Sequence, residues 1–354
     1  MWLESLGEWS WPGRGGGAAE VLPPPWVPAF PPRLEPALAM PATPQAWQPE
    51  RALRLGLGML LSALLALGAA LALNGQGGLE RLLGVRTGAA TAEDLPASRL
   101  AASPAQPPPT LTTVSQDEAG SSIDAARYTS AALHGEGSFF VYLPRGYAST
   151  TSHYPVLYLL HGNDQPATAF LQIGLQGELD SLIAHHVIPP LIAVMIQGGR
   201  GPNNWRNRYE SYVLEVQEMI DRMLPTIPAR GARAIAGDSM GGYGAMNVAL
   251  GNPYRFGVVE SWLGFFNGLE GELRADRPIL ERTGLHAFLY GAESDRIADP
   301  SENAPFAAAL RRAGASAGSA VYPGEHSLET LEAHLGSMLA YAGRALGRNH
   351  LHTG

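Results

Sequence analysis

The sequence contains no cysteine, and this absence removes several kinds of chemistry at once. Without a thiol the chain has no cysteine nucleophile, no disulfide, no thiolate metal site and no attachment point for a lipoprotein anchor. Lysine is absent too, so all 24 residues in the Lys and Arg count are arginines. Because alanine, glycine and proline are abundant, we attribute this to GC-rich codon usage and give single arginines no special chemical meaning.

Charge and aromatic rings are also scarce, at 16% and 8% of the residues. The net charge is −8, and no basic cluster stands out, which argues against nucleic acid as a partner. The 354 residues suffice for one large domain with attachments, or for two modest domains. We see no internal repeat.

The N-terminal residues 1–52 are rich in proline, glycine and tryptophan and show no hydrophobic period. Proline runs such as Pro23–Pro25 forbid a helix, and too few apolar residues remain for a core. We therefore predict a disordered segment. The alternative interpretation is that translation starts at Met40.

Residues 53–73 form an apolar stretch of about 20 residues, which is the length that crosses a bilayer. Its only charge is Arg54, near one end. We predict an uncleaved transmembrane or signal-anchor helix; a buried helix of the soluble domain is the alternative. Ala70–Ala72 fits a small-x-small cleavage site, so secretion after signal cleavage also stays open. Either membrane interpretation places the rest of the chain outside the cytoplasm, after a flexible linker at 74–122.

Residues 123–347 alternate short apolar runs with longer helical patterns. This alternation predicts a mostly parallel sheet with helices on both faces. The expected strands are 138–143, 155–160, 191–196, 232–236, 258–263, 287–290 and 319–322. The expected helices are 176–186, 209–224, 240–250, 301–313 and 327–346. We predict that residues 348–354 are a disordered tail.

The strongest local signal is the segment Gly237–Gly242, which reads GDSMGG between a predicted strand and a predicted helix. That is the context of a G-x-S-x-G nucleophile elbow, in which a sharp turn lifts the serine hydroxyl above the sheet of an α/β-hydrolase fold. The residues at both ends must be small because neighbouring chain passes close by. We therefore predict Ser239 as a nucleophile.

A serine hydroxyl needs a base to take its proton, and in this fold the partners follow in the order serine, acid, histidine. His326 follows the last predicted strand and precedes the last helix, where a loop can reach the elbow. His334 is the main competitor, but it lies about two turns inside that helix. We predict His326 as the base.

The acid should follow the strand at 287–290, in a loop that carries Glu293, Asp295 and Asp299. We choose Asp295 and keep Glu293 second and Asp299 third. The chosen carboxylate is expected to hold the imidazole tautomer and to stabilise its cation.

An oxyanion hole needs two backbone amides, which we assign to Met240, after the nucleophile, and Asn163, after the strand ending at Leu160. His161 in that loop is interpreted as a structural residue. Trp205 follows another strand end, where ligands bind in such sheets. We list it as a substrate-binding residue, with shielding of the sheet edge as an equal alternative.

Four segments, YLLHG at 158–162, YESY at 209–212, GDSMGGY at 237–243 and PGEHS at 323–327, resemble an esterase family that includes esterase D, feruloyl esterases and antigen 85 mycolyltransferases. The resemblance covers most of residues 123–347. It implies a serine–histidine–acid triad acting on acyl esters, without metal or organic cofactor. Ser239, His326, Asn163 and Met240 match the family's positions. Asp295 lies four residues after the strand-end glycine rather than three, and Glu325 stands where a small residue is common.

The leading hypothesis is an extracytoplasmic serine carboxylesterase acting on a small-molecule, lipid or sugar ester. Acyl transfer to a sugar or lipid hydroxyl through the same acyl-enzyme is the second hypothesis. The third is a non-catalytic binding domain, against which the intact serine and histidine argue. The specificity and the oligomeric state are not predicted.

Overall fold

The computed structural model of the protein describes residues 108–118, 120–149 and 151–350, the last three by their backbone alone. The predicted N-terminal segment 1–52, the predicted membrane helix 53–73 and most of the predicted linker lie outside these residues. Among the helices described, none is long and apolar enough to cross a membrane.

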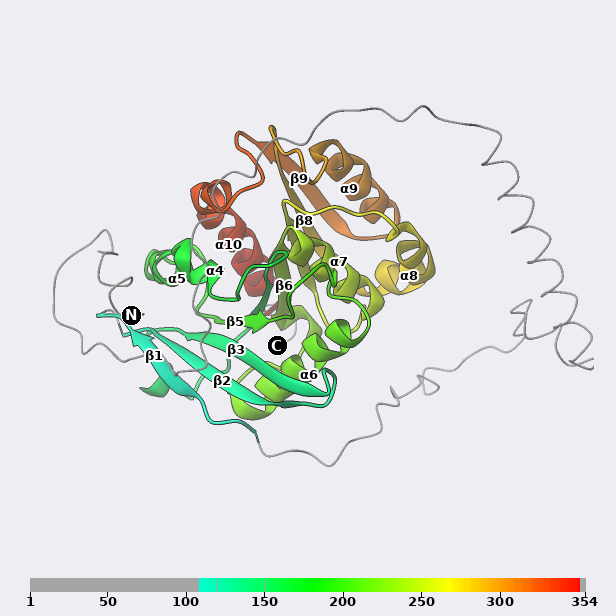
Figure 1. Ribbon diagram of the computed structural model, residues 1–354. Helices are drawn as coiled ribbons and strands as arrows, with labels where there is room; N and C mark the ends of the chain where they lie inside the picture. Colours follow the sequence, from blue (N-terminus) through cyan, green and yellow to red (C-terminus); the bar gives the residue numbers. More distant parts are fainter. Residues whose placement is uncertain (1–107, 119, 150, 351–354) are drawn as a thin grey trace, which may run out of the picture. The chain divides into compact units, whose positions relative to one another are not determined.

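One nine-stranded sheet forms the centre of the described part, in the order β1-β2-β3-β5-β4-β6-β7-β8-β9 (Figure 1). Its strands are β1 (Thr112–Gln116), β2 (Ser122–Ser130), β3 (Gly135–Leu143), β4 (Val156–Leu160), β5 (Ile192–Gln197), β6 (Arg233–Asp238), β7 (Val258–Trp262), β8 (His286–Ala292) and β9 (Ser316–Tyr322). The first three strands pair antiparallel, and β3 pairs antiparallel with β5. All pairs from β5 through β4 to β9 are parallel.

The central parallel strands β4, β6 and β7 are buried on both faces, and their apolar side chains belong to two clusters, one on each face. In β4, Val156, Tyr158 and Leu160 belong to one cluster, whereas Leu157 and Leu159 belong to the other. This explains why the sequence of β4 is apolar throughout, without alternation.

Helices cover both faces of the sheet (Figure 1). Residues of α6, α7, α8 and α9 share the cluster that contains Val156, and residues of α4, α5 and α10 share the cluster that contains Leu157. The helices are α4 (Ala169–Gln172), α5 (Leu175–Ala184), α6 (Arg208–Met223), α7 (Met240–Gly251), α8 (Glu270–Thr283), α9 (Asn303–Arg312) and α10 (Leu328–His350), with 3-10 turns η1 (Tyr147–Ser149), η2 (Arg230–Ala232) and η3 (Pro300–Glu302). The predicted architecture of a mostly parallel sheet between two helical layers is therefore present.

Several boundaries differ from the prediction. Strand β1 lies inside the predicted linker: its sequence TTVSQ is short and polar, and it is ordered by pairing with β2, which was not predicted either. Helix α8 was missed because it is rich in charge and contains Pro278. Helix α10 runs through His350, so the predicted tail at 348–354 begins too early.

Candidate active site

Ser239 lies at the turn between β6 and α7 with φ 53° and ψ −118°, a conformation that side-chain-bearing residues rarely adopt. Its amide donates to the Trp262 carbonyl at 2.7 Å, which ties the turn to β7. A Cβ on Gly237 would lie 2.4 Å from the Leu160 carbonyl oxygen, and a Cβ on Gly241 would lie 1.9 Å from it. The glycines are thus required by close approach of β4, and they allow the sharp turn that presents the serine.

Three side chains that follow the carboxyl ends of β6, β8 and β9 form one chain of hydrogen bonds. His326 Nε2 lies 2.8 Å from Ser239 Oγ, and His326 Nδ1 lies 2.7 Å from Asp295 Oδ2. The Asp295 side chain is 1% exposed and that of His326 is 14% exposed. Because an ionised carboxylate only accepts, Nδ1 carries the proton and Nε2 is free to accept from the serine hydroxyl.

The second carboxylate oxygen of Asp295 is also occupied. Oδ1 accepts from the amides of Ile297 at 2.8 Å and Ala298 at 2.9 Å. Two strand-end contacts join the acid loop to the histidine loop, because the amide of Ser294 donates to the Gly324 carbonyl at 2.9 Å and that of Glu293 to the Tyr322 carbonyl at 2.8 Å. The acid is therefore held in place before any substrate arrives.

The other candidate acids lie elsewhere. Glu293 is exposed, and Asp299 accepts from the Ser301 amide at 2.9 Å, where it caps η3 and where this bond lowers its pKa. Of the competing bases, His334 packs against the rings of Tyr322 and Tyr290, at centroid distances of 4.6 and 5.5 Å. The structure brings His326 and Asp295, rather than these residues, to Ser239.

The two predicted oxyanion amides lie on adjacent strand ends. Met240 is the first residue of α7, where amides have no acceptor inside the helix and the helix dipole favours negative charge. Asn163 is exposed in the loop after β4, and β4 pairs with β6 through Leu160 and Gly237. Both amides therefore belong to the same edge of the sheet as the serine.

Trp205 lies beneath this site and not on a wall open to solvent: it is 0% exposed. Its Nε1 donates to the His161 carbonyl at 3.1 Å, and its ring packs edge-on against the His161 ring at 5.2 Å. The predicted substrate-binding role of Trp205 therefore has no support in this arrangement. A small residue is needed at Gly244, whose added Cβ would lie 2.5 Å from Trp205.

His161 is a neutral, structural histidine. Burial lowers its pKa to about 4, so it is uncharged near neutral pH. Its Nε2 accepts from the Gly198 amide at 2.9 Å, so its Nδ1 carries the proton and donates to the Gly162 carbonyl at 2.8 Å. His161 thus fastens the loop of Asn163 to the end of β5.

Three residues near the site, Tyr243, Arg206 and Glu272, were not predicted from the sequence. Tyr243, one turn after the nucleophile, stacks on Phe265 at 4.9 Å and accepts from Arg206 Nη1 at 2.8 Å. Arg206 also pairs with Glu272 at 3.0 Å. Tyr243 ends the GDSMGGY motif and could have been noticed there, whereas Glu272 lies on the missed helix α8.

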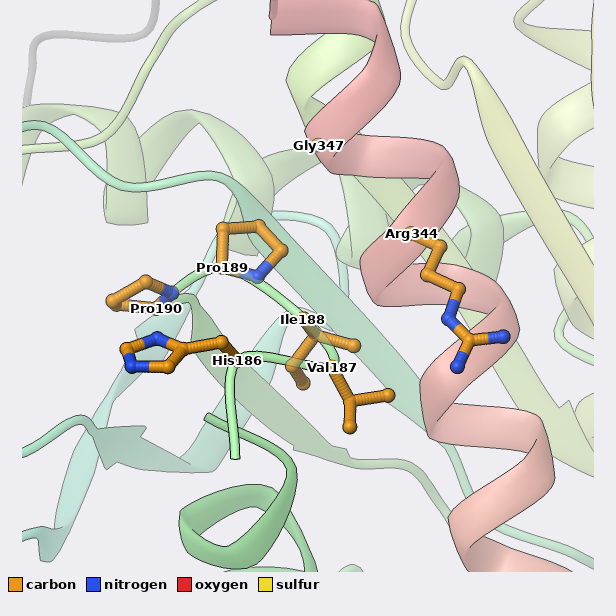
Figure 2. A pocket seen from close by; sticks show the side chains of 7 residues that line it. All are labelled: His186, Val187, Ile188, Pro189, Pro190, Arg344 and Gly347. Atoms are coloured by element: carbon orange, nitrogen blue, oxygen red, sulfur yellow. The ribbon is translucent and has the colours of Figure 1, made fainter. Parts of the chain in front are cut away.

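A hollow of about 460 Å³ lies away from this site, between the loop before β5 and the C-terminal half of α10 (Figure 2). Its lining residues are His186, Val187, Ile188, Pro189, Pro190, Arg344 and Gly347. None of the hydrogen-bonded triad residues contributes to it.

The strained serine, its histidine and the buried carboxylate define a serine hydrolase of the α/β-hydrolase fold. A family model described as "Putative esterase" matches residues 130–312, and the chain belongs to this family of serine ester hydrolases.

Two curated relatives are similar to part of the chain. An endo-1,4-beta-xylanase/feruloyl esterase of Xylanibacter ruminicola is 35% identical over 130 residues, which are 33% of this chain and 18% of that protein. An esterase of Mycobacterium tuberculosis is 31% identical over 137 residues, which are 35% of this chain and 28% of that protein. The match thus spans less than a third of either relative.

Solved structures share the fold over a larger part of the chain. A ferulic acid esterase superposes with a TM-score of 0.58 at 22% identity, over 64% of this chain and 98% of that one. An S-formylglutathione hydrolase from Agrobacterium tumefaciens gives 0.52 at 20% identity, over 66% and 99%. At these identities the likeness establishes the fold alone.

Proposed function

We propose that the protein is a carboxylesterase that hydrolyses acyl esters through an acyl-enzyme on Ser239. The observation that carries this proposal is the continuous hydrogen-bonded chain from Ser239 Oγ through His326 to the buried Asp295. Family membership supports the reaction class.

In the proposed reaction, Ser239 Oγ attacks the ester carbonyl carbon while His326 Nε2 takes the hydroxyl proton. Asp295 stabilises the resulting imidazolium, and the amides of Met240 and Asn163 hold the oxyanion. His326 then gives its proton to the leaving alkoxide, which departs as an alcohol. Water, deprotonated by His326, attacks the acyl-enzyme by the reverse steps, and the acid leaves.

For the substrate, we propose an ester of an aromatic acid such as a hydroxycinnamate. Two relatives bear the name feruloyl or ferulic acid esterase. Phe265 is partly exposed and stacks on the buried Tyr243, one helical turn from the nucleophile, so its ring supplies apolar surface close to the elbow.

We also propose that residues 53–73 anchor the protein in a membrane, with the ester-hydrolysing domain, residues 108–350, outside the cytoplasm. The support is the apolar length of this segment in the sequence. Recovery of the full chain with membranes after a carbonate wash is the expected result. A shortened species in the soluble fraction would instead indicate cleavage near Ala72.

The proposal is tested by fluorophosphonate labelling and by turnover of methyl ferulate beside a p-nitrophenyl ester series. We expect label on the peptide containing Ser239 and faster release of the aromatic acid than of aliphatic acids of equal size. Ser239→Ala should lose label and turnover while its thermal unfolding stays cooperative; unchanged turnover in that variant rules out the nucleophile.

The same assay separates hydrolysis from acyl transfer. With a sugar or lipid alcohol added, hydrolysis yields free acid alone, whereas a transferase yields a new ester. If the new ester dominates, the acceptor of the acyl group is an alcohol rather than water. The acyl-enzyme on Ser239 is common to both reactions.

A further inference from the structure

Asp238 directly precedes the nucleophile, is 2% exposed and takes no part in the triad. Its side chain lies under the loop that follows β4: a Cβ on Gly162 would be 2.7 Å from Asp238 Oδ2. The Gln165 side chain lies against the same point, 3.1 Å from that Cβ, and Gln165 and the Gly162 amide partly offset the rise in the pKa of Asp238 that burial causes. A buried acid at the elbow is thus joined to the loop of Asn163.

Gln165 completes this contact from the other side. Its side-chain Oε1 accepts from the Gly162 amide at 3.2 Å, and its backbone amide donates to the Gly162 carbonyl at 3.4 Å. Both polar groups of Gly162 are therefore occupied, the carbonyl also by His161 Nδ1 at 2.8 Å.

The direction of the Asn163 amide follows from these contacts. The Gly162 carbonyl and the Asn163 N–H belong to one planar trans peptide unit, in which they point in opposite directions. The His161 ring and the backbone amide of Gln165 fix this carbonyl and therefore the direction of the N–H, while the Gln165 side chain holds Gly162 on its other side through the Gly162 amide. An oxyanion donor is effective only when it is held in its direction before the charge develops.

We propose that Asp238 and Gln165 are a positioning pair that clamps Gly162 and, through this residue, keeps the Asn163 amide directed toward the oxyanion. This inference rests on the proposed function and deepens it. A carboxyl group with amide partners is costly to bury, and burial raises the pKa of Asp238 to about 7. A role in holding the loop gives a reason for keeping an acid at this place.

The test exchanges the carboxyl group of Asp238 and the side-chain amide of Gln165 by substitution. Asp238→Asn and Gln165→Glu each break the match between donor and acceptor, whereas the double variant restores it with the carboxylate on the other side. We expect each single variant to lower kcat about 10- to 100-fold with KM within about threefold, since loss of a full oxyanion donor costs about 10²- to 10³-fold. The double variant should return to within about fivefold of the original kcat.

A second readout follows the oxyanion itself. A trifluoromethyl ketone forms a hemiketal oxyanion on the serine, so its binding should weaken in parallel with kcat/KM across the series. Glu260→Gln is the matched control, because Glu260 is another fully buried carboxyl, on β7, bonded to Trp262 Nε1 at 3.0 Å. It should keep kcat within about twofold.

If Asp238→Asn does not fold, Gln165→Ala gives the answer, because Gln165 is only half-buried and its removal leaves no new buried charge. It should lower kcat about tenfold and weaken the ketone equally. An unchanged kcat in the folded single variants, or a double variant no better than either, overturns the positioning role. If the unmodified protein turns over no ester, the proposed function falls as well, so the two failures are distinguishable.

Discussion

At the nucleophile, backbone atoms rather than side chains set the geometry. Ser239 adopts its strained φ because Gly237 and Gly241 let β4 approach the turn. The strain is maintained by the surrounding hydrogen bonds, including that of the serine amide to Trp262. The backbone of the turn therefore places the serine hydroxyl, whose hydrogen bond to His326 follows from that placement.

Gly241→Ala should therefore abolish activity and lower the free energy of unfolding by about 3 kcal/mol or more. Its new Cβ would meet the Leu160 carbonyl, which belongs to a central strand and cannot move aside. Gly271→Ala in α8 is the control, since nothing lies within 4 Å of its Cβ and a helical alanine is favoured. Urea unfolding of both variants gives the comparison, and equal stabilities would contradict the role of close approach.

Asp295→Asn should lower kcat by about 10³- to 10⁴-fold, because an amide can present its N–H to Nδ1 and favour the wrong tautomer of His326. Glu293→Gln, two residues away and exposed, should change kcat less than threefold. Steady-state turnover of one p-nitrophenyl ester by both variants checks this. A larger loss in the Glu293 variant would move the acid to Glu293.

Much of the triad could be predicted from residue types and order, because the elbow, the acid loop and the histidine loop each follow a recognisable strand. The choice of Asp295 over Glu293 could not be secured, since both lie in one loop and only the three-dimensional path of that loop separates them. Asp238 was read only as the variable position of the elbow, because its partner Gln165 is more than 70 residues away in the sequence and nothing local marks the pair.

At the scale of elements, the loop between β5 and α6 supports the active site from the side of the protein interior. Trp205 from this loop packs under His161, which in turn holds the loop of Asn163. Loss of the Trp205 ring would leave a large cavity next to the loop that carries Asn163.

Trp205→Ala should lower the free energy of unfolding by about 3 to 5 kcal/mol, as expected for a fully buried tryptophan. Trp205→Phe keeps most of the packing but not the bond to the His161 carbonyl. It should cost less stability and still reduce kcat several-fold, with KM nearly unchanged. A raised KM with normal kcat in the Phe variant would instead favour direct contact with substrate.

Element prediction succeeded where hydrophobic patterns are strong and failed where they are weak. The buried strands and amphipathic helices of the parallel half lie within a few residues of the predicted positions. The missed elements β1, β2 and α8 are polar, charged or interrupted by proline, so tertiary pairing and packing decide their structure. Helix α4 was missed as well, because its four residues are too few to show a helical period.

At the scale of the whole molecule, buried acids should make stability depend on pH. Burial raises the pKa of Glu260 to about 8, so the folded protein keeps this proton at pH values where the unfolded chain has lost it. The contribution of Glu260 to the free energy of unfolding is then fully present below about pH 4.5 and is lost progressively as the pH rises toward 8. Asp238, with a pKa of about 7, contributes in the same direction.

Glu260→Gln removes this proton and should flatten the dependence. Between pH 5 and pH 8 the unmodified protein should lose on the order of 4 kcal/mol more than the variant, at 1.36 kcal/mol per pH unit and proton. Chemical denaturation at the two pH values measures the difference. Parallel curves would show that Glu260 is ionised in the folded protein.

The order of the triad along the chain has a consequence for biosynthesis. Ser239 and His326 are 87 residues apart, and β8 and β9 must be added to the sheet edge before the histidine loop can form. A ribosome that has produced the elbow has therefore not yet produced an esterase. The nascent chain becomes catalytically competent only after β9 and the histidine loop have been synthesised. Truncated products that end before His326 therefore lack the general base and should not hydrolyse esters.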